Sequence, residues 1–283
     1  MRNVHSFIRE GEQKMKKTGR NIFAALLLAF CTSMIVLCGT AFADTKVDLG
    51  VITNDSDKPF TGVSKEYGKI YHTFTVNQPG ILIVTGVAKY LSDSKESAWR
   101  SMSVGLYSKD GKLIDRYAAN TVNSDEKKYV CYGLRKGTYQ ICLQGYKDYM
   151  YILGVNFTAT KDQGGAKKKK ATPLKKKREF CDIIGAGTNA KTCGWFKFTT
   201  NGKKKVKLQI TTAGQGSFRV DVKGKNTKIL EFVGANESGT LTLFTKRYSS
   251  GGVKKIPLKA GTYYVKISKS WDKTNGAFAI KWK

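Results

Sequence analysis

Histidine, proline and acidic residues are scarce in this chain, which has two His, four Pro and 21 Asp plus Glu among 283 residues. With only His5 and His72, paired-histidine zinc motifs such as H-E-x-x-H cannot be built. Few acids beside 50 Lys plus Arg give a formal charge of +29, which favours an anionic polymer or a membrane surface as partner. A hydrophobic content of 41% excludes a chain that is disordered throughout.

Long apolar runs are absent too, except for one near the N-terminus. It extends from Ile22 to Cys38, follows a basic stretch at residues 14–20, and is followed by the small-residue sequence Ala41-Phe42-Ala43. This order predicts a secretory signal peptide over residues 1–43, cut after Ala43. The alternative is an uncleaved membrane anchor, because about 17 apolar residues reach the lower limit for a spanning helix. The signal predicts a secreted or cell-surface protein with His72 as its single histidine.

Four cysteines remain after the signal, at Cys131, Cys142, Cys181 and Cys193. An even number in an exported protein predicts structural disulfides. Sequence order favours pairing Cys131 with Cys142 and Cys181 with Cys193. Neither pair has a C-x-x-C spacing, so redox or metal chemistry is the weaker alternative.

The most informative feature of the remaining chain is an internal repeat. Leu134-Arg-Lys-Gly-Thr-Tyr139 recurs 124 residues later as Leu258-Lys-Ala-Gly-Thr-Tyr263. The same offset aligns five apolar pairs, namely Phe74 with Phe198, Leu82 with Val206, Val84 with Leu208, Ile141 with Val265 and Leu143 with Ile267. We therefore expect two homologous units at residues 44–160 and 179–283, joined by a polybasic linker at 161–178.

Each unit has the alternation typical of β-strands. Apolar and polar residues alternate over residues 205–210 and 263–268, the period of a strand with one buried face. Turn signals such as Asp110-Gly111, Asn201-Gly202 and Asn275-Gly276 separate the runs. The sequence predicts an all-β fold of two tandem antiparallel β-sandwiches.

The order of these elements resembles a known family. Aromatic-containing strands at residues 71–76 and 195–200, the turn Tyr107-Ser-Lys-Asp-Gly-Lys-Leu-Ile114 and the two L-x-x-G-T-Y motifs are similar to the bacterial pre-peptidase C-terminal domain. The resemblance implies two jelly-roll-like sandwiches of a secreted or surface-associated bacterial protein. It also implies an accessory binding module without catalysis, which in some members binds collagen, polysaccharide or calcium.

A calcium site is the only metal or cofactor hypothesis that the residues support. Asp48, Asn54, Asp55 and Asp57 form an acidic cluster near the start of the first unit, where related modules hold the ion. The spacing lacks the glycine and terminal Glu of an EF-hand, so the pattern indicates calcium weakly. We expect no other cofactor.

The repeat also interprets single residues. His72 aligns with Phe196, which predicts a core-side or strand-edge histidine rather than a catalytic base. Cys131 and Cys142 align with Lys255 and Lys266. Both cysteines are therefore expected on an outer face, as a cross-strand disulfide.

The charge is concentrated in the second half of the chain. Residues 44–160 hold 15 basic and 12 acidic residues, a net charge of +3, whereas residues 161–283 hold 29 and 7, a net charge of +22. The predicted polyanion-binding residues lie in the linker and at outward strand positions: Lys167, Lys168, Lys169, Lys170, Lys175, Lys176, Lys177, Arg178, Lys197, Lys203, Lys205, Lys207, Lys266 and Lys281. The linker is expected to be extended and solvated. The alternative is that these lysines only solvate the protein and block sheet edges.

Three functions follow from these features. The first is an exported, non-catalytic binding protein whose basic second unit and linker attach to an anionic cell-wall polymer, an acidic or sulfated glycan, or an anionic membrane surface. Specific nucleic-acid binding is not expected, because no RNP, KH or helix-turn-helix pattern occurs. The second is a pair of carbohydrate-binding modules that use the loop aromatics Tyr146, Tyr149 and Trp271. The third is an enzyme with a nucleophile activated without histidine, such as a Ser-Lys dyad, for which the sequence nominates no residue.

Overall fold

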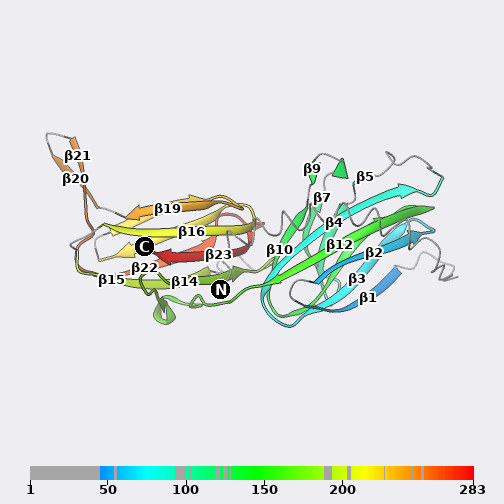
Figure 1. The fold of residues 1–283 in the computed structure, drawn as a ribbon, viewed down its shortest axis with the longest axis horizontal. Helices are drawn as coiled ribbons and strands as arrows, with labels where there is room; N and C mark the ends of the chain where they lie inside the picture. The colour runs from blue at the N-terminus through cyan, green and yellow to red at the C-terminus, as the bar shows by residue number, and fades with distance from the viewer. Residues whose placement is uncertain are drawn as a thin grey trace. The chain divides into compact units, whose positions relative to one another are not determined.

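The structure is a computed structural model. It describes residues 45–283 apart from 54–55, 93–99, 102, 119–121, 124–125, 128, 188–192, 203–204, 226, 244 and 250–251. The predicted signal peptide, Asn54, Asp55 and Lys203 lie outside the described residues, and the side chain of Asp57 is not described. The predicted all-β, antiparallel sandwich class is confirmed (Figure 1).

The chain forms two compact units. The described residues of the first unit are 45–75, Ile83–Val130 and Thr138–Phe157, and the second unit contains Val76–Leu82, Cys131–Gly137 and Thr158–Lys283. No helix among the described residues is long and apolar enough to cross a membrane.

Two sheets form the N-terminal sandwich. The first has the order β1 (Thr45–Ile52), β3 (Gly68–Val76), β11 (Gly137–Gly145), β6 (Ser103–Ser108) and β7 (Leu113–Ala118). The second has the order β10 (Val130–Leu134), β4 (Gly80–Tyr90), β12 (Tyr149–Ala159) and β2 (Ser56–Ser64), with β5 (Arg100–Ser101) also paired to β4. A short hairpin joins β8 (Val122–Asn123) to β9 (Glu126–Lys127).

The C-terminal sandwich also has two sheets. A five-stranded sheet has the order β13 (Thr172–Pro173), β15 (Cys193–Thr200), β22 (Gly261–Lys269), β17 (Phe218–Gly224) and β18 (Thr227–Val233). A four-stranded sheet has the order β14 (Glu179–Ile184), β23 (Asn275–Trp282), β16 (Val206–Gln215) and β19 (Ser238–Leu243). The hairpin of β20 (Thr245–Ser249) and β21 (Gly252–Ile256) projects away from these sheets (Figure 1).

The two sandwiches share one strand order. The series β1, β3, β11, β6, β7 matches β13, β15, β22, β17, β18, and the series β10, β4, β12, β2 matches β19, β16, β23, β14. All five apolar pairs related by the 124-residue offset are buried in both copies. A hydrogen bond between Thr75 and Thr138 hydroxyls (2.9 Å) recurs between Thr199 and Thr262 (3.0 Å), at the same offset.

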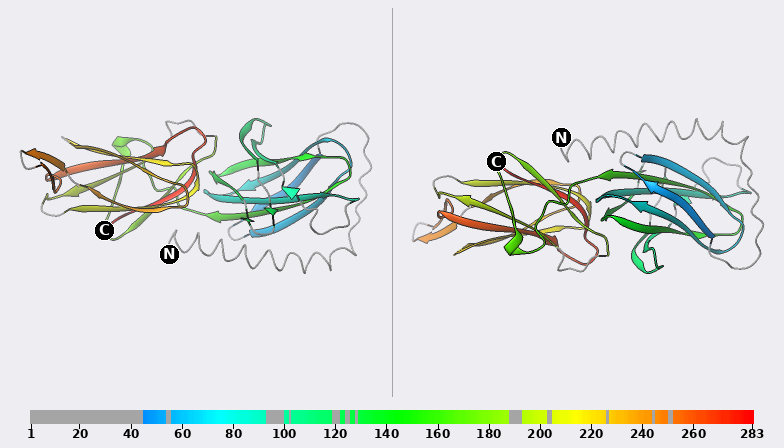
Figure 2. Two further views of the ribbon diagram at one scale, coloured as in Figure 1. Left: turned by 90° about the horizontal axis from the view of Figure 1, so that it is seen from above. Right: turned by 90° about the horizontal axis from the view of Figure 1, so that it is seen from below.

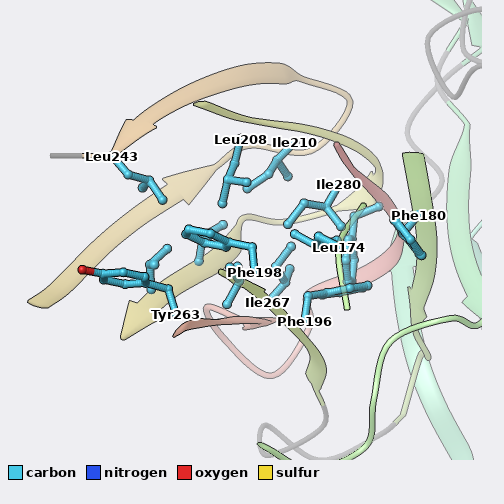
Figure 3. Packing of buried hydrophobic residues seen from close by; sticks show 14 of the residues in the cluster. Leu174, Phe180, Phe196, Phe198, Leu208, Ile210, Leu243, Tyr263, Ile267 and Ile280 are labelled. Atoms are coloured by element: carbon cyan, nitrogen blue, oxygen red, sulfur yellow. The ribbon is translucent and has the colours of Figure 1, made fainter. Parts of the chain in front are cut away.

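The core of the second unit lies between its two sheets, which stack face to face (Figure 2). Phe196, Phe198, Leu208, Ile210 and Ile280 pack there with at most 2% of their surface exposed. Their alternation along β15, β16 and β23 places every second side chain in this layer. Leu174, from the predicted linker, is a member of the same cluster (Figure 3).

The predicted solvated linker is therefore wrong, because residues 163–178 fold onto the second unit. Thr172 pairs in parallel with Phe196, and the Leu174 N–H donates to the Lys197 carbonyl (2.7 Å). The Lys177 N–H donates to the Trp282 carbonyl (2.6 Å). Ala171 and Leu174 are buried, and burial of these two apolar side chains holds the segment despite its charge.

The predicted disulfides are not formed, because all four cysteines are present as thiols. The strands β10 and β11, which carry Cys131 and Cys142, belong to different sheets, as do β14 and β15 with Cys181 and Cys193. The predicted exposed position is also wrong, because Cys131 and Cys142 are buried. Cys142 does point outward from β11, but the Tyr107 ring lies over Gly105, which is its register partner.

Two of the turn signals meet different outcomes. Gly202 lies between β15 and β16 with φ of 78°, so Asn201-Gly202 marks a turn as predicted. Asn275 and Gly276 instead open β23, where Gly276 pairs with Gly214 of β16. The turn precedes them at residues 271–274, where the Thr274 N–H donates to the Trp271 carbonyl (3.0 Å).

Candidate functional site: a basic face on the second unit

The outer surface of the five-stranded sheet in the second unit carries most of the site, and we call it the basic face. Side chains at odd positions of β15 and β17 point outward because their neighbours Phe196, Phe198, Val220 and Val222 are buried. Register places the outward residues in three rows across the strands: Lys197, Tyr264, Lys223 and Lys228; Trp195, Lys266, Asp221 and Leu230; Cys193, Ser268, Arg219 and Phe232.

Tyr264 lies at the centre of the lysines on this face. Lys197 and Lys223 flank it on the two adjacent strands, and neighbouring strands lie about 4.8 Å apart. The ammonium group of Lys168 lies 4.7 Å from the centroid of the Tyr264 ring, a cation–π distance. Three lysines from three elements therefore surround one tyrosine, and one of them comes from the polybasic segment.

The acidic residue on this face does not offset the lysines. The Asp221 carboxylate is buried and accepts two hydrogen bonds from Arg219, at 3.0 Å from Nε and 3.1 Å from Nη2. A bidentate pair of this kind satisfies both carboxylate oxygens. The nearby Lys197, Lys223 and Lys266 thus keep their charge for an external anion.

Seven of the other predicted basic residues lie on or beside a different sheet, which corrects the expectation of one basic surface. Lys167, Lys169 and Lys170 instead belong to the turn around Lys168, before β13. After β13 the polybasic segment crosses to the four-stranded sheet, where Lys176 bridges to Trp282. Lys175, Lys176, Lys177 and Arg178 are exposed there. Lys207 of β16 and Lys281 of β23 point outward from the same sheet, and Lys205 precedes β16. Positive charge therefore covers both outer faces of this sandwich.

The loop aromatics of the first unit form a second candidate site, the tyrosine cluster. Tyr67 and Tyr146 meet edge to face at 6.0 Å, Tyr146 and Tyr149 at 5.3 Å, and Tyr149 and Tyr90 at 4.7 Å. Tyr67, Tyr90 and Tyr146 are 60%, 41% and 40% exposed. Tyr149 is buried beneath the others, so its predicted role as a stacking surface is wrong. It supports the exposed rings instead.

Trp271, the third predicted aromatic, lies in the loop before β23 and is 51% exposed. Its indole nitrogen lies so close to Gly216 that a side chain there would overlap it. Gly216 has φ of 72°, a backbone conformation that favours glycine. Glycine at this position thus leaves room for the indole.

His72 is a core residue, as its alignment with Phe196 predicted. It is 1% exposed, and its Nε2 lies 3.1 Å from the Tyr151 hydroxyl. Burial lowers the His72 pKa to about 4, against a smaller opposing effect of a hydrogen bond to the Ile141 backbone. A neutral, buried imidazole is a poor general base for an external substrate.

The predicted calcium ligands are largely outside the described residues. Asp48 is described and exposed, and its Oδ1 accepts a hydrogen bond from the Gly50 N–H (2.8 Å). No group of three or more His, Cys, Asp or Glu side chains with metal-binding geometry occurs within the described part of the chain.

One buried carboxyl group of the second unit has a strongly shifted pKa. Asp182 is 2% exposed, and its carboxyl group packs against Gly164 and Gly194, where a side chain would overlap it. Burial, and then a hydrogen bond and the charge of Asp162, raise the Asp182 pKa to about 8. The absence of side chains at Gly164 and Gly194 leaves room for this carboxyl group.

Sequence reasoning missed several residues of both sites. Arg219, Lys223 and Lys228 belong to the basic face. The alternation of residues 218–223 indicates the outward positions of Arg219 and Lys223, whereas Lys228 is placed only by its register with Lys223. Alternation places Tyr264 outward but gives no reason to single it out. Tyr67 lies in the loop between β2 and β3 and Tyr90 ends β4, so no local pattern could join them to Tyr146.

Comparisons with known proteins give no family. No family model matches the chain, and none of the curated proteins matches it. One similar solved structure is the Aeromonas hydrophila PliG, a periplasmic inhibitor of g-type lysozyme (13% identity, 41% of this chain and 100% of that one, TM-score 0.28). A second is the CUB1-EGF-CUB2 region of human MASP-1/3 (6% identity, 80% of this chain and 99% of that one, TM-score 0.23). A third is the extracellular region of zebrafish Gpr126 (9% identity, 85% of this chain and 36% of that one, TM-score 0.26). TM-scores this low carry no argument about this chain, and the resemblance to the pre-peptidase C-terminal domain stays a prediction.

Proposed function

We propose that the protein is an exported, non-catalytic binding protein whose second unit attaches to an anionic polymer, such as a cell-wall polymer or an acidic or sulfated glycan. The observation that carries the proposal is the group of Lys168, Lys197 and Lys223 around Tyr264. An ordinary solvated surface needs no such convergence of three elements. Lysine is a compact charge without the planar fork of arginine, so the proposed recognition is of charge density rather than of one anion's shape.

The folded polybasic segment supports this function. Because residues 167–178 are held against both sheets, the backbone that carries their charges is ordered before a ligand arrives. A disordered linker would lose conformational entropy on binding, and an ordered one avoids most of that loss. The segment is therefore part of the proposed binding surface.

The test is a salt-graded binding measurement with the full chain on two probes, heparin and purified bacterial cell wall. The variant Lys168→Ala/Lys197→Ala/Lys223→Ala removes three charges from the basic face. Three lysine contacts at about 1 kcal/mol each, the value for lysines near an anionic lipid surface, predict roughly 100-fold weaker binding at low salt. Binding should also weaken steeply between low and physiological salt, because screening shortens to about 8 Å.

A matched control removes the same charge elsewhere. Lys46, Lys65 and Lys69 are exposed in the first unit, and their replacement by alanine should weaken binding by less than threefold. Equal losses in the two triple variants would show that net charge alone drives adsorption. Binding that is unchanged at high salt would contradict the electrostatic proposal outright.

A second function, carbohydrate binding by the first unit, is favoured by the tyrosine cluster. Exposed aromatic rings stack on the C–H faces of sugars, and Tyr67, Tyr90 and Tyr146 present three such rings at one place. Retention on a neutral polysaccharide that resists salt but is lost in Tyr67→Ala/Tyr146→Ala would establish it. Trp271→Ala, which changes the predicted stacking residue of the second unit, should leave this retention unchanged if the tyrosine cluster is the sugar-binding site.

A further inference from the structure

The edge strand β18 carries a feature that polymer binding does not use. It is the last strand of its sheet. It pairs with β17 along its whole length without a register shift, from the pair Thr227 and Gly224 to the pair Val233 and Phe218. Within the described part of the chain, no strand pairs with its other side. Backbone N–H and C=O groups along a seven-residue edge are thus available for pairing with another chain.

Two other edges of this sandwich are blocked, and the third, β19, has six residues against the seven of β18. β13 has two residues, one of them Pro173, which has no N–H to donate. The edge of β14 is occupied by Gln163, which exchanges two hydrogen bonds with Cys181 at 3.0 and 2.8 Å. β18 has neither a proline nor a bulge, so two of the devices that stop strand addition are missing. Its exposed charges, Lys228 and Glu231, leave the edge open only to a partner of suitable charge.

The side chains of β18 describe what its occupant must look like. Lys228, Leu230 and Phe232 point outward, because their register partners Lys223, Asp221 and Arg219 do. Leu230 is 41% exposed and Phe232 is 58% exposed. Two exposed apolar side chains at alternate positions can contact apolar residues at the facing positions of an added strand.

The charge around this edge selects an acidic partner. Lys223, Lys225 and Lys228 are exposed beside it. Asp221 is held by Arg219, and the other acid, Glu231, lies at a position of opposite parity on β18. The region from residue 161 onward has a net charge of +22, so a second copy of this chain would be repelled.

We propose that β18 binds an extended acidic peptide segment, which adds to the five-stranded sheet as a sixth strand. In antiparallel addition, residues beside Phe232, Leu230 and Lys228 occur in the order apolar-x-apolar-x-acidic along the partner. In parallel addition the order is reversed. The main chain supplies hydrogen bonds, and these three positions supply specificity. The proposal does not depend on polymer binding by the basic face.

The test uses the full chain with synthetic peptides as probes: the capped peptide TVTVTET, its reversed sequence, and TVTVTET with alternate amides N-methylated. The experiment is done at roughly 150 mM salt, which gives physiological screening. One of the first two peptides should slow hydrogen–deuterium exchange at the β18 amides. The N-methylated peptide should give no protection, because it cannot form the strand ladder. Protection by the N-methylated peptide, or none by either unmodified one, would overturn the proposal.

Variants separate the apolar and charged parts of the recognition. Leu230→Thr/Phe232→Thr keeps strand propensity at exposed positions and should weaken peptide binding at least tenfold. The exposed Leu113 of β7, replaced by threonine, is the matched control in the first unit and should leave binding unchanged. Lys228→Glu should shift preference from TVTVTET to TVTVTKT. An unchanged preference, or β18 protection that instead follows protein concentration and dimer formation without peptide, contradicts an acidic partner.

These results are distinguishable from those of the polymer test. The triple lysine variant should lose heparin binding whether or not peptides bind, and Leu230→Thr/Phe232→Thr should keep heparin binding. Failure of one proposal therefore leaves the other standing.

Discussion

Phe198 and Tyr263 stack with ring centroids 5.5 Å apart and an interplanar angle of 11°. Their counterparts 124 residues earlier, Phe74 and Tyr139, stack at 6.0 Å and 28°. The second residue of each pair is the tyrosine of an L-x-x-G-T-Y motif. The motif thus conserves a packing contact within the chain: its tyrosine covers the phenylalanine of the neighbouring strand.

The stacked pair predicts equivalent losses in the two units. Phe198→Ala and Phe74→Ala remove rings that are 2% and 0% exposed, so each should lower the free energy of unfolding of its own sandwich by about 3–5 kcal/mol. Chemical denaturation followed by the tryptophan and tyrosine signals measures both. A loss below about 1 kcal/mol for either variant would contradict the packing role.

Leu174 predicts that the polybasic segment is a structural element. Leu174→Ala should destabilise the second unit by about 2–4 kcal/mol, because a leucine that is 5% exposed leaves a cavity in the core. Leu230→Ala changes the same residue type at a 41% exposed site and should cost under about 0.5 kcal/mol. If the two leucine variants melted alike, residues 163–178 would be a linker after all.

Asp182 predicts a pH dependence of stability with a definite sign. Its pKa is raised to about 8 in the folded protein, mainly by burial, whereas an unfolded aspartate titrates near 4. Between these values the folded state binds more protons, so this group makes the protein less stable as pH rises from about 4 to 8. Asp182→Asn should flatten the dependence and raise the melting temperature at pH 8 relative to wild type.

The control for this prediction is Asp272→Asn, which changes an exposed carboxyl group in the same unit. It should leave the slope of melting temperature against pH unaltered. A wild-type protein that became steadily more stable from pH 5 to pH 8, with Asp182→Asn behaving identically, would mean that Asp182 is ionised when folded.

The cysteines predict a thiol count that separates the structure from the disulfide hypothesis. Denatured but unreduced protein, without the predicted signal, should react with four equivalents of a thiol reagent. In the native protein Cys131 should react slowest, because burial raises its pKa to about 12 and only the thiolate attacks the reagent. Two equivalents in the denatured protein would reveal a disulfide.

Alternation predicted the strands and the core well, because it reports a local property. The apolar positions of 205–210 and 263–268 are buried as expected. Alternation could not assign strands to sheets, so Lys197 and Lys207 were expected on one surface and lie on opposite sheets. The outward position of Cys142 was also predicted, but alternation could not show that it is buried, with the Tyr107 ring lying over its register partner, Gly105.

Composition gave the wrong prediction for the polybasic segment, because two buried apolar residues outweigh eight basic ones. Eight basic residues within Lys167–Arg178 indicate a solvated chain. The structure holds this segment by Ala171, Leu174 and backbone pairing to β15. All eight basic side chains are exposed. Because they stay hydrated, folding of the segment does not require burying their charge.

That arrangement restricts how the charge of this protein can change during evolution. A true linker can be shortened, lengthened or exchanged with little effect on its neighbours, and its charge with it. Here a deletion that removed the basic residues would also remove Leu174 from the core and β13 from its sheet. Selection can therefore adjust this charge by substituting one lysine at a time. An insertion or deletion in the segment changes the stability of the second unit as well as its charge.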